Sequence, residues 1–254
     1  MPPGRQAKRI PKLSNAVLDD AEHCARLIWV GTSYLKDKAR HTEDERFLEQ
    51  FSKPVEGFLT KQVPKITFDQ KHIHDLMVVG GLKALFRSKS QLDFNQFQLY
   101  LEMELPSLLQ KNTYLNATQV SDFLKSAGKA LVSKSVNTNA GYRVALASRI
   151  LFFALPNLRL FNFSNDLAEV LMLPTRPQVA IYKFQEIFEN GLAINKSQLS
   201  SYPIPKSHGL VSQNAYFTNL IQGDWWQRRI LDLAVRIHFQ TVTPLNPLPL
   251  RPFP

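Results

Sequence analysis

Apolar residues along this chain recur at intervals of three and four, which is the spacing of one face of an α-helix. Val17–Leu35 shows the pattern, with acids in its first turn, where the helix dipole favours negative charge. Asp69–Arg87 repeats it, interrupted by the pair Gly80-Gly81. Both segments are therefore predicted to be helices with one buried face.

Cap residues and prolines predict the limits of further helices. Thr42–Phe51 is a short charged helix, and Pro54, Gly57 and Pro64 then indicate a loop. Three more helices follow from similar signals: Asp93 to about Leu109, Asn116 or Thr118 to about Val132, and Trp225–Phe239 after Asp224. A further helix is predicted at Gln178–Asn190, because Thr175 and Pro177 precede this segment and Gly191 follows it.

The stretch Asn139–Met172 indicates a helix rich in small residues, a proline-marked turn and a second helix. We expect Pro156 to end the first helix and Ser164 to cap the second by accepting a hydrogen bond from the N–H of Asp166 or Leu167. Ile150, Leu151, Phe153 and Ala154 should point into the core, with Arg149 at the edge and Phe152 partly buried. That cap, beside Arg149 and Arg159, would be a phosphate site.

The chain shows no period-2 alternation or hairpin signal, so the predicted fold class is all-α, a compact bundle of roughly eight to ten helices. Three parts are expected along it. Residues 1–15 form a flexible basic arm, residues 16–240 a single helical domain with a subdivision near residue 112 as an alternative, and residues 241–254 a Pro-rich tail.

Charge is unevenly distributed. The whole chain has a formal net charge of +10. Residues 105–165 hold seven bases and one acid, Asp122, which leaves +6 in this region alone. Because protein surfaces usually mix both signs, this excess favours a polyanionic partner, nucleic acid first and an anionic membrane second.

Other totals exclude several classes of protein. The single cysteine, Cys24, cannot form an internal disulfide or a cysteine-based zinc site, and it fits a reducing compartment. No apolar run is long enough for a membrane span, and the basic N-terminus is not followed by a signal-peptide core. We therefore expect a cytoplasmic protein that does not enter the membrane, associated with the nucleoid if it is bacterial.

Catalytic and metal-binding signatures are missing from the sequence. His72 and His74 are two residues apart, so on a helix they point about 200° away from each other and cannot share an ion. The acidic runs at Asp19-Asp20 and Glu43–Glu45 fall at helix starts, where they balance the dipole. Neither a cofactor nor a bound metal is expected.

Several bases are candidates for phosphate contact. Lys125 and Lys129 lie one helical turn apart and share a face. Trp225 could stack on a base, but a tryptophan packed in the core with arginines at the surface is the preferred interpretation. The predicted DNA-binding residues are Lys125, Lys129, Lys134, Arg143, Arg149, Arg159, Arg228 and Arg229.

About thirty residues partly resemble the helix-hairpin-helix DNA glycosylases of the bacterial 8-oxoguanine glycosylase-like type. The similar segments are ASRILFFALP at residues 147–156, an aromatic turn at Leu160–Phe163, and SNDLAEVL at residues 164–171. The resemblance implies a DNA-binding helical scaffold. Arg149 and Ser164 stand where those enzymes carry a nucleophilic lysine and an aspartate. Arginine stays protonated and cannot be the nucleophile, so the implied scaffold lacks the chemistry.

The expected function is therefore a non-catalytic, basic DNA-binding protein, from a mobile element or an antiviral (anti-phage) defence locus. Double-stranded DNA is the expected partner. One alternative is an enzyme that processes nucleic acid, of glycosylase or nuclease type, with Asp166 or Asp122 as its carboxylate. Another is an adaptor that binds proteins through its basic surface and Pro-rich tail.

Overall fold

The computed structural model describes residues 6–29, 44–79, 92–110, 115–132, 140–205 and 224–241. These ranges contain nine helices and no strand, so the prediction of an all-α fold is confirmed. In the described part of the chain, an isolated antiparallel bridge pairs Leu92 with Val132. The helices are α1 (Asn15–Trp29), α2 (Asp44–Leu59), α3 (Gln70–Val79), α4 (Phe94–Gln110), α5 (Ala117–Leu131), α6 (Ala140–Ala154), α7 (Asn165–Val170), α8 (Pro177–Leu199) and α10 (Trp225–His238).

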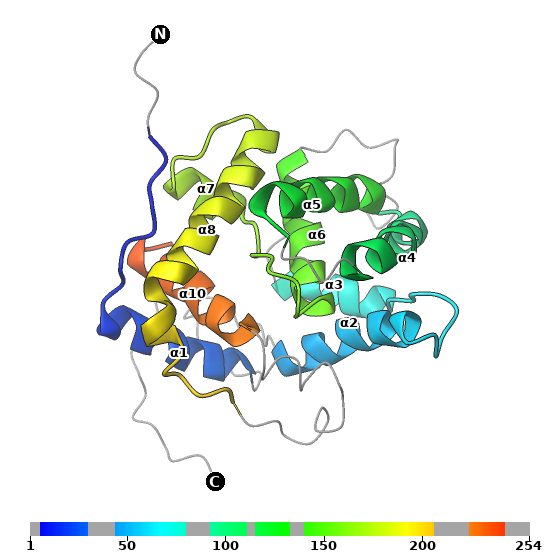
Figure 1. Cartoon of the computed structure of the whole chain (residues 1–254), viewed down its shortest axis with the longest axis horizontal. Helices are drawn as coiled ribbons and strands as arrows, with labels where there is room; N and C mark the ends of the chain where they lie inside the picture. Colours follow the sequence, from blue (N-terminus) through cyan, green and yellow to red (C-terminus); the bar gives the residue numbers. More distant parts are fainter. Residues whose placement is uncertain are drawn as a thin grey trace.

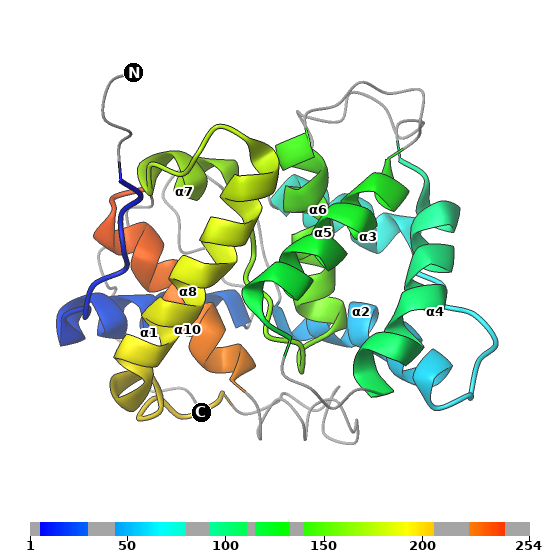
Figure 2. The same cartoon turned by 45° about the horizontal axis from the view of Figure 1, so that its top comes forward.

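The helices form two neighbouring groups around one continuous core. Figures 1 and 2 show α1, α7, α8 and α10 on one side of the molecule and α2 to α6 on the other. Helix α5 packs against both α6 and α8, which joins the groups, and α1 packs against α10. Aromatic residues fill the centre: Trp29 makes edge contacts with Trp225 and Trp226 at ring-centroid distances of 6.2 and 6.0 Å. Within the described ranges no helix is both long and apolar enough to cross a membrane.

Local signals predicted several helix ends correctly. Asn116 starts α5 with a capping box, in which its side chain and that of Gln119 each bond the other residue's backbone N–H. The N–H of Gln96 donates to Asp93 Oδ1 at 2.9 Å, the bond expected of a cap for α4. Helix α6 ends at Ala154, just before the proline at 156. The predicted continuations of α1 to Leu35 and of α3 to Arg87 lie outside the described residues.

The prediction of a loop after Phe51 was wrong, because α2 continues through Pro54 and Gly57 to Leu59. Proline removes one helical hydrogen bond, but Val55 is fully buried on the same face as Phe47 and Phe51. Burying an aliphatic side chain contributes about 1.5–3 kcal/mol, which offsets much of that loss. Tertiary packing thus overrides the local signal.

Helix α8 also runs further than predicted, from Pro177 to Leu199, with Gly191 in its interior. A glycine there costs about 1 kcal/mol relative to alanine. A Cβ at this position would lie 2.8 Å from Ile10 Cδ1, so the missing side chain makes room for Ile10. Residues 6–14, which belong to the segment predicted to be a flexible basic arm, pack against the helices, and Ile10 and Leu13 are each only 2% exposed. Residues 1–5 and the Pro-rich tail after residue 241 lie outside the described ranges.

Candidate nucleic-acid interface

The crossing of α5 and α6 is the centre of the predicted basic region. A Cβ on Gly128 would lie 3.1 Å from the backbone carbon of Arg143 and 3.2 Å from the backbone nitrogen of Val144. The two backbones therefore approach at Gly128, and the N-terminal turn of α6 lies beside the C-terminal half of α5. Close packing at this point fixes the position of α5 relative to α6 and therefore the backbone positions of the basic residues on both helices.

Three of the predicted cations surround this crossing. Lys129 is exposed, and within the described residues it makes no ion pair. Lys125 pairs with Asp122 at 2.8 Å, an exposed i,i+3 pair, and Arg143 is half-buried. We call Lys125, Lys129 and Arg143 the crossing cluster. Lys134, the fourth member predicted for this area, lies outside the described residues.

Arg149 lies at the edge of α6 as predicted, half-buried between core positions. Ile150, Leu151 and Ala154 are fully buried, and Phe153 is 5% exposed. Phe152 is 2% exposed rather than partly buried, because it packs on Trp225 with a centroid distance of 5.0 Å. Burial raises the pKa of the Asp44 carboxyl, and the charge of Arg149 opposes part of that rise, so this arginine acts on an acid of the protein itself.

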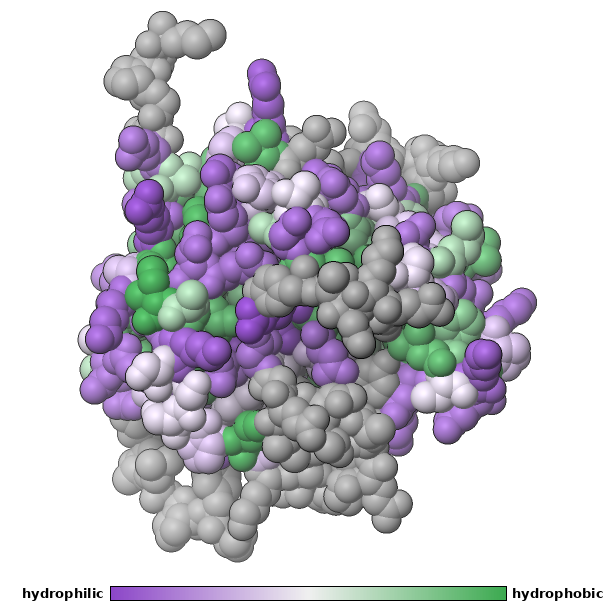
Figure 3. Space-filling view, in the orientation of Figure 1, coloured by the Kyte–Doolittle hydropathy of each residue, from purple (hydrophilic) through white to green (hydrophobic). Residues whose placement is uncertain are grey.

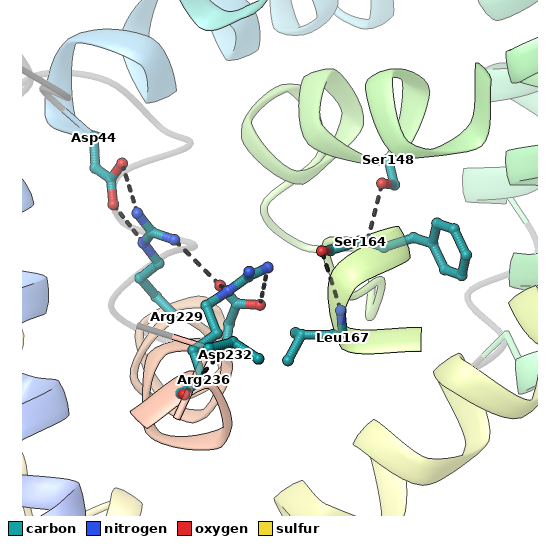
Figure 4. A network of polar contacts seen from close by, with 9 residues as sticks. Asp44, Ser148, Ser164, Leu167, Arg229, Asp232 and Arg236 are labelled. Atoms are coloured by element: carbon teal, nitrogen blue, oxygen red, sulfur yellow. Dashed lines mark hydrogen bonds and ion pairs between the residues drawn. The ribbon is translucent and has the colours of Figure 1, made fainter. Parts of the chain in front are cut away.

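Ser164 caps α7 as expected, accepting a hydrogen bond from the N–H of Leu167 at 3.4 Å (Figure 4). The phosphate site expected there does not follow from this cap. Helix α7 has only six residues, and the acid Asp166 occupies its first turn. Arg159, the base expected beside it, pairs with Asp224 at 2.5 Å. A short helix has a weak dipole field, and an acid at its start competes with an anion.

Arg228 is fully buried, which corrects its prediction as a surface contact to DNA. Its guanidinium donates to the backbone oxygens of Pro156 at 2.6 Å and Leu160 at 2.8 Å, and it pairs with Asp224 at 2.7 Å. The arginine thus ties the start of α10 to the turn after α6. The preferred interpretation of the tryptophans is confirmed, because Trp225 and Trp226 are 0% and 1% exposed.

Arg229 joins a second group of charges between α2 and α10 (Figure 4). It bonds Asp44 Oδ2 at 2.6 Å and Asp44 Oδ1 at 3.3 Å, and it lies 3.5 Å from Asp232. Arg236 binds both oxygens of Asp232, at 3.2 and 3.3 Å. We call Asp44, Arg229, Asp232 and Arg236 the α2–α10 seam.

Burial dominates the electrostatics of this seam. Loss of solvent raises the pKa of the Asp44 carboxyl above its ordinary value of 3.8, and Arg229 and Arg149 lower it by charge and hydrogen bonding. Burial likewise raises the pKa of the neighbouring Cys24 thiol to about 11, so this thiol is not a reactive nucleophile at neutral pH. Both shifts belong to groups that hold the fold together.

The seam was not predicted from the sequence, although part of its signal was present. Asp232 lies three residues after Arg229 and four before Arg236, the spacings at which opposite charges meet on a helix. Asp44 could not be assigned as the fourth member, because it lies 185 residues from Arg229. A second missed feature is the contact of Asn195 with the N-terminal arm, 182 residues away at Leu13.

The described residues hold no group of three or more histidine, cysteine, aspartate or glutamate side chains suited to a metal ion. His72 Nε2 lies 4.0 Å from Asp69, one turn away on the surface of α3. Comparisons of the chain with protein-family models, with curated proteins and with solved structures give no match in any of the three. A functional hypothesis therefore depends on the charge and exposure of the surface residues.

Proposed function

We propose that this protein binds double-stranded DNA through its phosphates, with little sequence preference and without catalysis. The observation that carries the proposal is the crossing cluster. Close approach of α5 and α6 at Gly128 places the backbone of Arg143 beside the part of α5 that carries Lys125 and Lys129, and residues 105–165 contain a single acid. Because phosphate contacts are charge contacts to a uniform backbone, such a surface binds without reading bases.

The binding surface is smaller than the predicted set of eight residues. Arg228 is fully buried, Arg229 bonds the buried Asp44, and the charge of Arg149 opposes the rise that burial causes in the pKa of Asp44. Arg159 pairs with Asp224, whose side chain is only 17% exposed, whereas the partner of Lys125, Asp122, is 66% exposed. The proposal therefore assigns DNA contact to the crossing cluster alone among the described residues. A mobile-element or antiviral role and a nucleoid or cytoplasmic location are the settings that such a protein would fit.

A salt titration tests the proposal. The affinity for a duplex of about 25 base pairs is measured by fluorescence anisotropy from about 50 to 200 mM salt. Each phosphate contact contributes roughly −0.9 to the slope of log K against log salt. The double substitution Lys125→Ala and Lys129→Ala should reduce the slope by roughly two units, equally for unrelated sequences.

A matched control separates this surface from net charge. Lys61 and Lys65 are exposed and, within the described residues, make no ion pair. Their double alanine variant removes the same two charges from the turn after α2 and should change the slope much less. Equal losses in both variants, or a wild-type affinity that hardly responds to salt, would reject the crossing cluster as the interface.

The absence of catalysis is tested separately. Arg149 stands where the similar glycosylases hold a lysine and is permanently protonated. Duplexes containing oxidised guanine should stay intact after incubation and alkali treatment, and borohydride should trap no covalent adduct. A trapped adduct on any lysine would reject this part of the proposal and favour the nucleic-acid-processing alternative.

A further inference from the structure

The N-terminal segment of residues 6–14, which we call the docked arm, lies in an extended conformation against α8. Figures 1 and 2 show it passing along the α7–α8 side of the molecule before α1 begins. The N–H of Lys8 donates to the backbone oxygen of Leu171 at 2.9 Å. Ile10 and Leu13 are buried three residues apart, so the arm is held at both anchors.

Asn195 of α8 is the polar part of this attachment. Its Oδ1 accepts the N–H of Leu13 at 2.8 Å, and its Nδ2 donates to the backbone oxygens of Pro11 at 3.1 Å and Gly191 at 2.8 Å. The side chain is fully buried, although most asparagines are exposed. One helix residue therefore fixes two arm residues, Pro11 and Leu13, while Gly191 one turn earlier provides the space for Ile10.

The side of the arm that faces solvent is cationic. Lys8, Arg9 and Lys12 are exposed, as is Lys196 beside Asn195 on α8. Lys8 lies over the ring of Phe239 at 5.4 Å, whereas Arg9, Lys12 and Lys196 make no ion pair within the described parts of the chain. Figure 3 shows hydrophilic side chains along the arm at the left edge of this face. The exposed acids of the neighbouring α7 are Asp166 and Glu169.

We infer that Arg9, Lys12 and Lys196 form a second phosphate-binding surface for duplex DNA, held in place by the docking of the arm. This inference rests on the proposed function for its ligand, and it names a surface apart from the crossing cluster. Residues 9 and 12 of an extended chain are about 10 Å apart. Three nucleotide steps of one DNA strand cover about the same distance along the axis, at roughly 3.4 Å each.

Fixing the arm matters because a disordered cationic segment loses conformational entropy when it binds, and an ordered one has already lost it. The buried anchors Ile10 and Leu13 thus raise the affinity of Arg9 and Lys12 for phosphates without touching the ligand. The surface predicts two separable effects: the number of charges sets the salt slope, and the attachment to Asn195 sets the affinity at a given salt concentration.

Two variants test these effects by anisotropy with the same duplex. The triple substitution Arg9→Ala, Lys12→Ala and Lys196→Ala should lower the salt slope by roughly two to three units. Its control, Lys61→Ala with Lys65→Ala and Lys71→Ala, removes three exposed lysines elsewhere and should have a smaller effect. Asn195→Ala keeps every charge, so it should weaken binding several-fold at fixed salt and leave the slope nearly unchanged.

Limited trypsin digestion reports the docking directly. The wild-type protein should resist cleavage after Arg9 and Lys12, and Asn195→Ala or Gly191→Val should become susceptible while circular dichroism stays helical. Susceptibility of the wild type at these sites would overturn the docking. An unchanged affinity of Asn195→Ala once its arm is cleavable would overturn the role of docking in binding.

The outcomes separate this inference from the proposed function. If the triple variant binds like the wild type while Lys125→Ala with Lys129→Ala loses affinity, the arm surface is wrong and the crossing cluster stands. If the wild type does not bind duplex DNA, both fail. If the arm cations are needed only for binding vesicles of 30% phosphatidylserine, the ligand is a membrane surface and the inference is overturned.

Discussion

Basic side chains have different roles in two regions of the molecule, the α5–α6 crossing and the α2–α10 seam. At the crossing, Lys129 is exposed, and the acid that pairs with Lys125 among the described residues is the exposed Asp122. In the seam, Arg229 and Arg236 have side chains only 12% and 13% exposed, and both bind buried carboxylates. Both regions contain basic side chains, but the crossing presents lysines to solvent, whereas the seam pairs its arginines with buried acids, Arg229 across two helices and Arg236 within α10.

The difference shows why a count of basic residues overestimates a binding surface. Buried charges need partners, because an ion removed from water without one costs several kcal/mol. The seam supplies Asp44 and Asp232, and Asp224 does the same for Arg159 and Arg228. Arg159, Arg228 and Arg229 thus contribute to the net charge of +10 while they connect α10 or its cap to other elements, and Arg236 pairs with Asp232 within α10.

Exposed hydrophobic side chains also differ between regions of the molecule. Figure 3 shows hydrophilic side chains over much of the visible face, with hydrophobic ones in smaller groups, one of them on the side where α4 lies. Leu99 and Met103 of α4 are 49% and 70% exposed, one turn apart on the helix. Because α4 carries no base, this side is distinct from the cationic crossing.

The largest expected effect is the loss of stability when the α2–α10 seam is broken. Asp44→Ala removes the fully buried partner of Arg229 and should lower the free energy of unfolding by about 3–5 kcal/mol, measured by urea denaturation. The double variant with Arg229→Met should lose clearly less than the sum of the two single variants. Glu169→Ala, an exposed acid of α7, is the control and should change stability little. Additive single losses would show that the two residues do not act as a pair.

A smaller effect should follow from changing the crossing itself. An alanine at Gly128 meets backbone atoms of Arg143 and Val144, which cannot rotate away, so Gly128→Ala should lower stability by about 1 kcal/mol and weaken DNA binding. Gly57→Ala is the matched comparison, since its Cβ meets only the side chain of Val63 at 3.2 Å. That variant should be neutral or gain up to about 1 kcal/mol from helix propensity. Similar losses in both would mean that the close backbone approach has no special role.

The cations of the crossing should matter little for folding. Lys125→Ala with Lys129→Ala is expected to change the free energy of unfolding by less than about 0.5 kcal/mol, because exposed pairs contribute little. The same urea titration that detects the seam variants would measure it. A loss of more than about 1 kcal/mol would place these lysines among the structural charges and contradict the contrast between the two regions.

The smallest effect is a pH dependence of the seam. Burial raises the pKa of Asp44 above 3.8, so the folded state holds this proton more tightly than the unfolded chain does. The contribution of Asp44 to stability is then fully present below about pH 3.8 and declines as pH rises through the raised pKa. Relative to Asp44→Asn, the wild type should become less stable as pH increases across this window. An opposite trend in urea midpoints would show that the pairing with Arg229 dominates over burial.

The sequence by itself determined the all-α class, the caps at Asp93 and Ser164, and the end of α6 before Pro156. For α5 it left Asn116 and Thr118 as alternative caps, and the structure has Asn116. Each depends on side chains within a few residues of the backbone groups that they serve, so the information is local. The same holds for the buried face of α6, whose apolar stripe was predicted except for the depth of Phe152.

Only the tertiary structure decided the positions of Pro54 and Gly191 inside helices, the docking of residues 6–14, and which cations reach solvent. These outcomes depend on partners far away in sequence: Ile10 for Gly191, Asn195 for Leu13, and Asp44 for Arg229 across 185 residues. A pattern of charges gives the sign of a surface field. Whether a given arginine contributes to that field depends on the acid that folding places beside it.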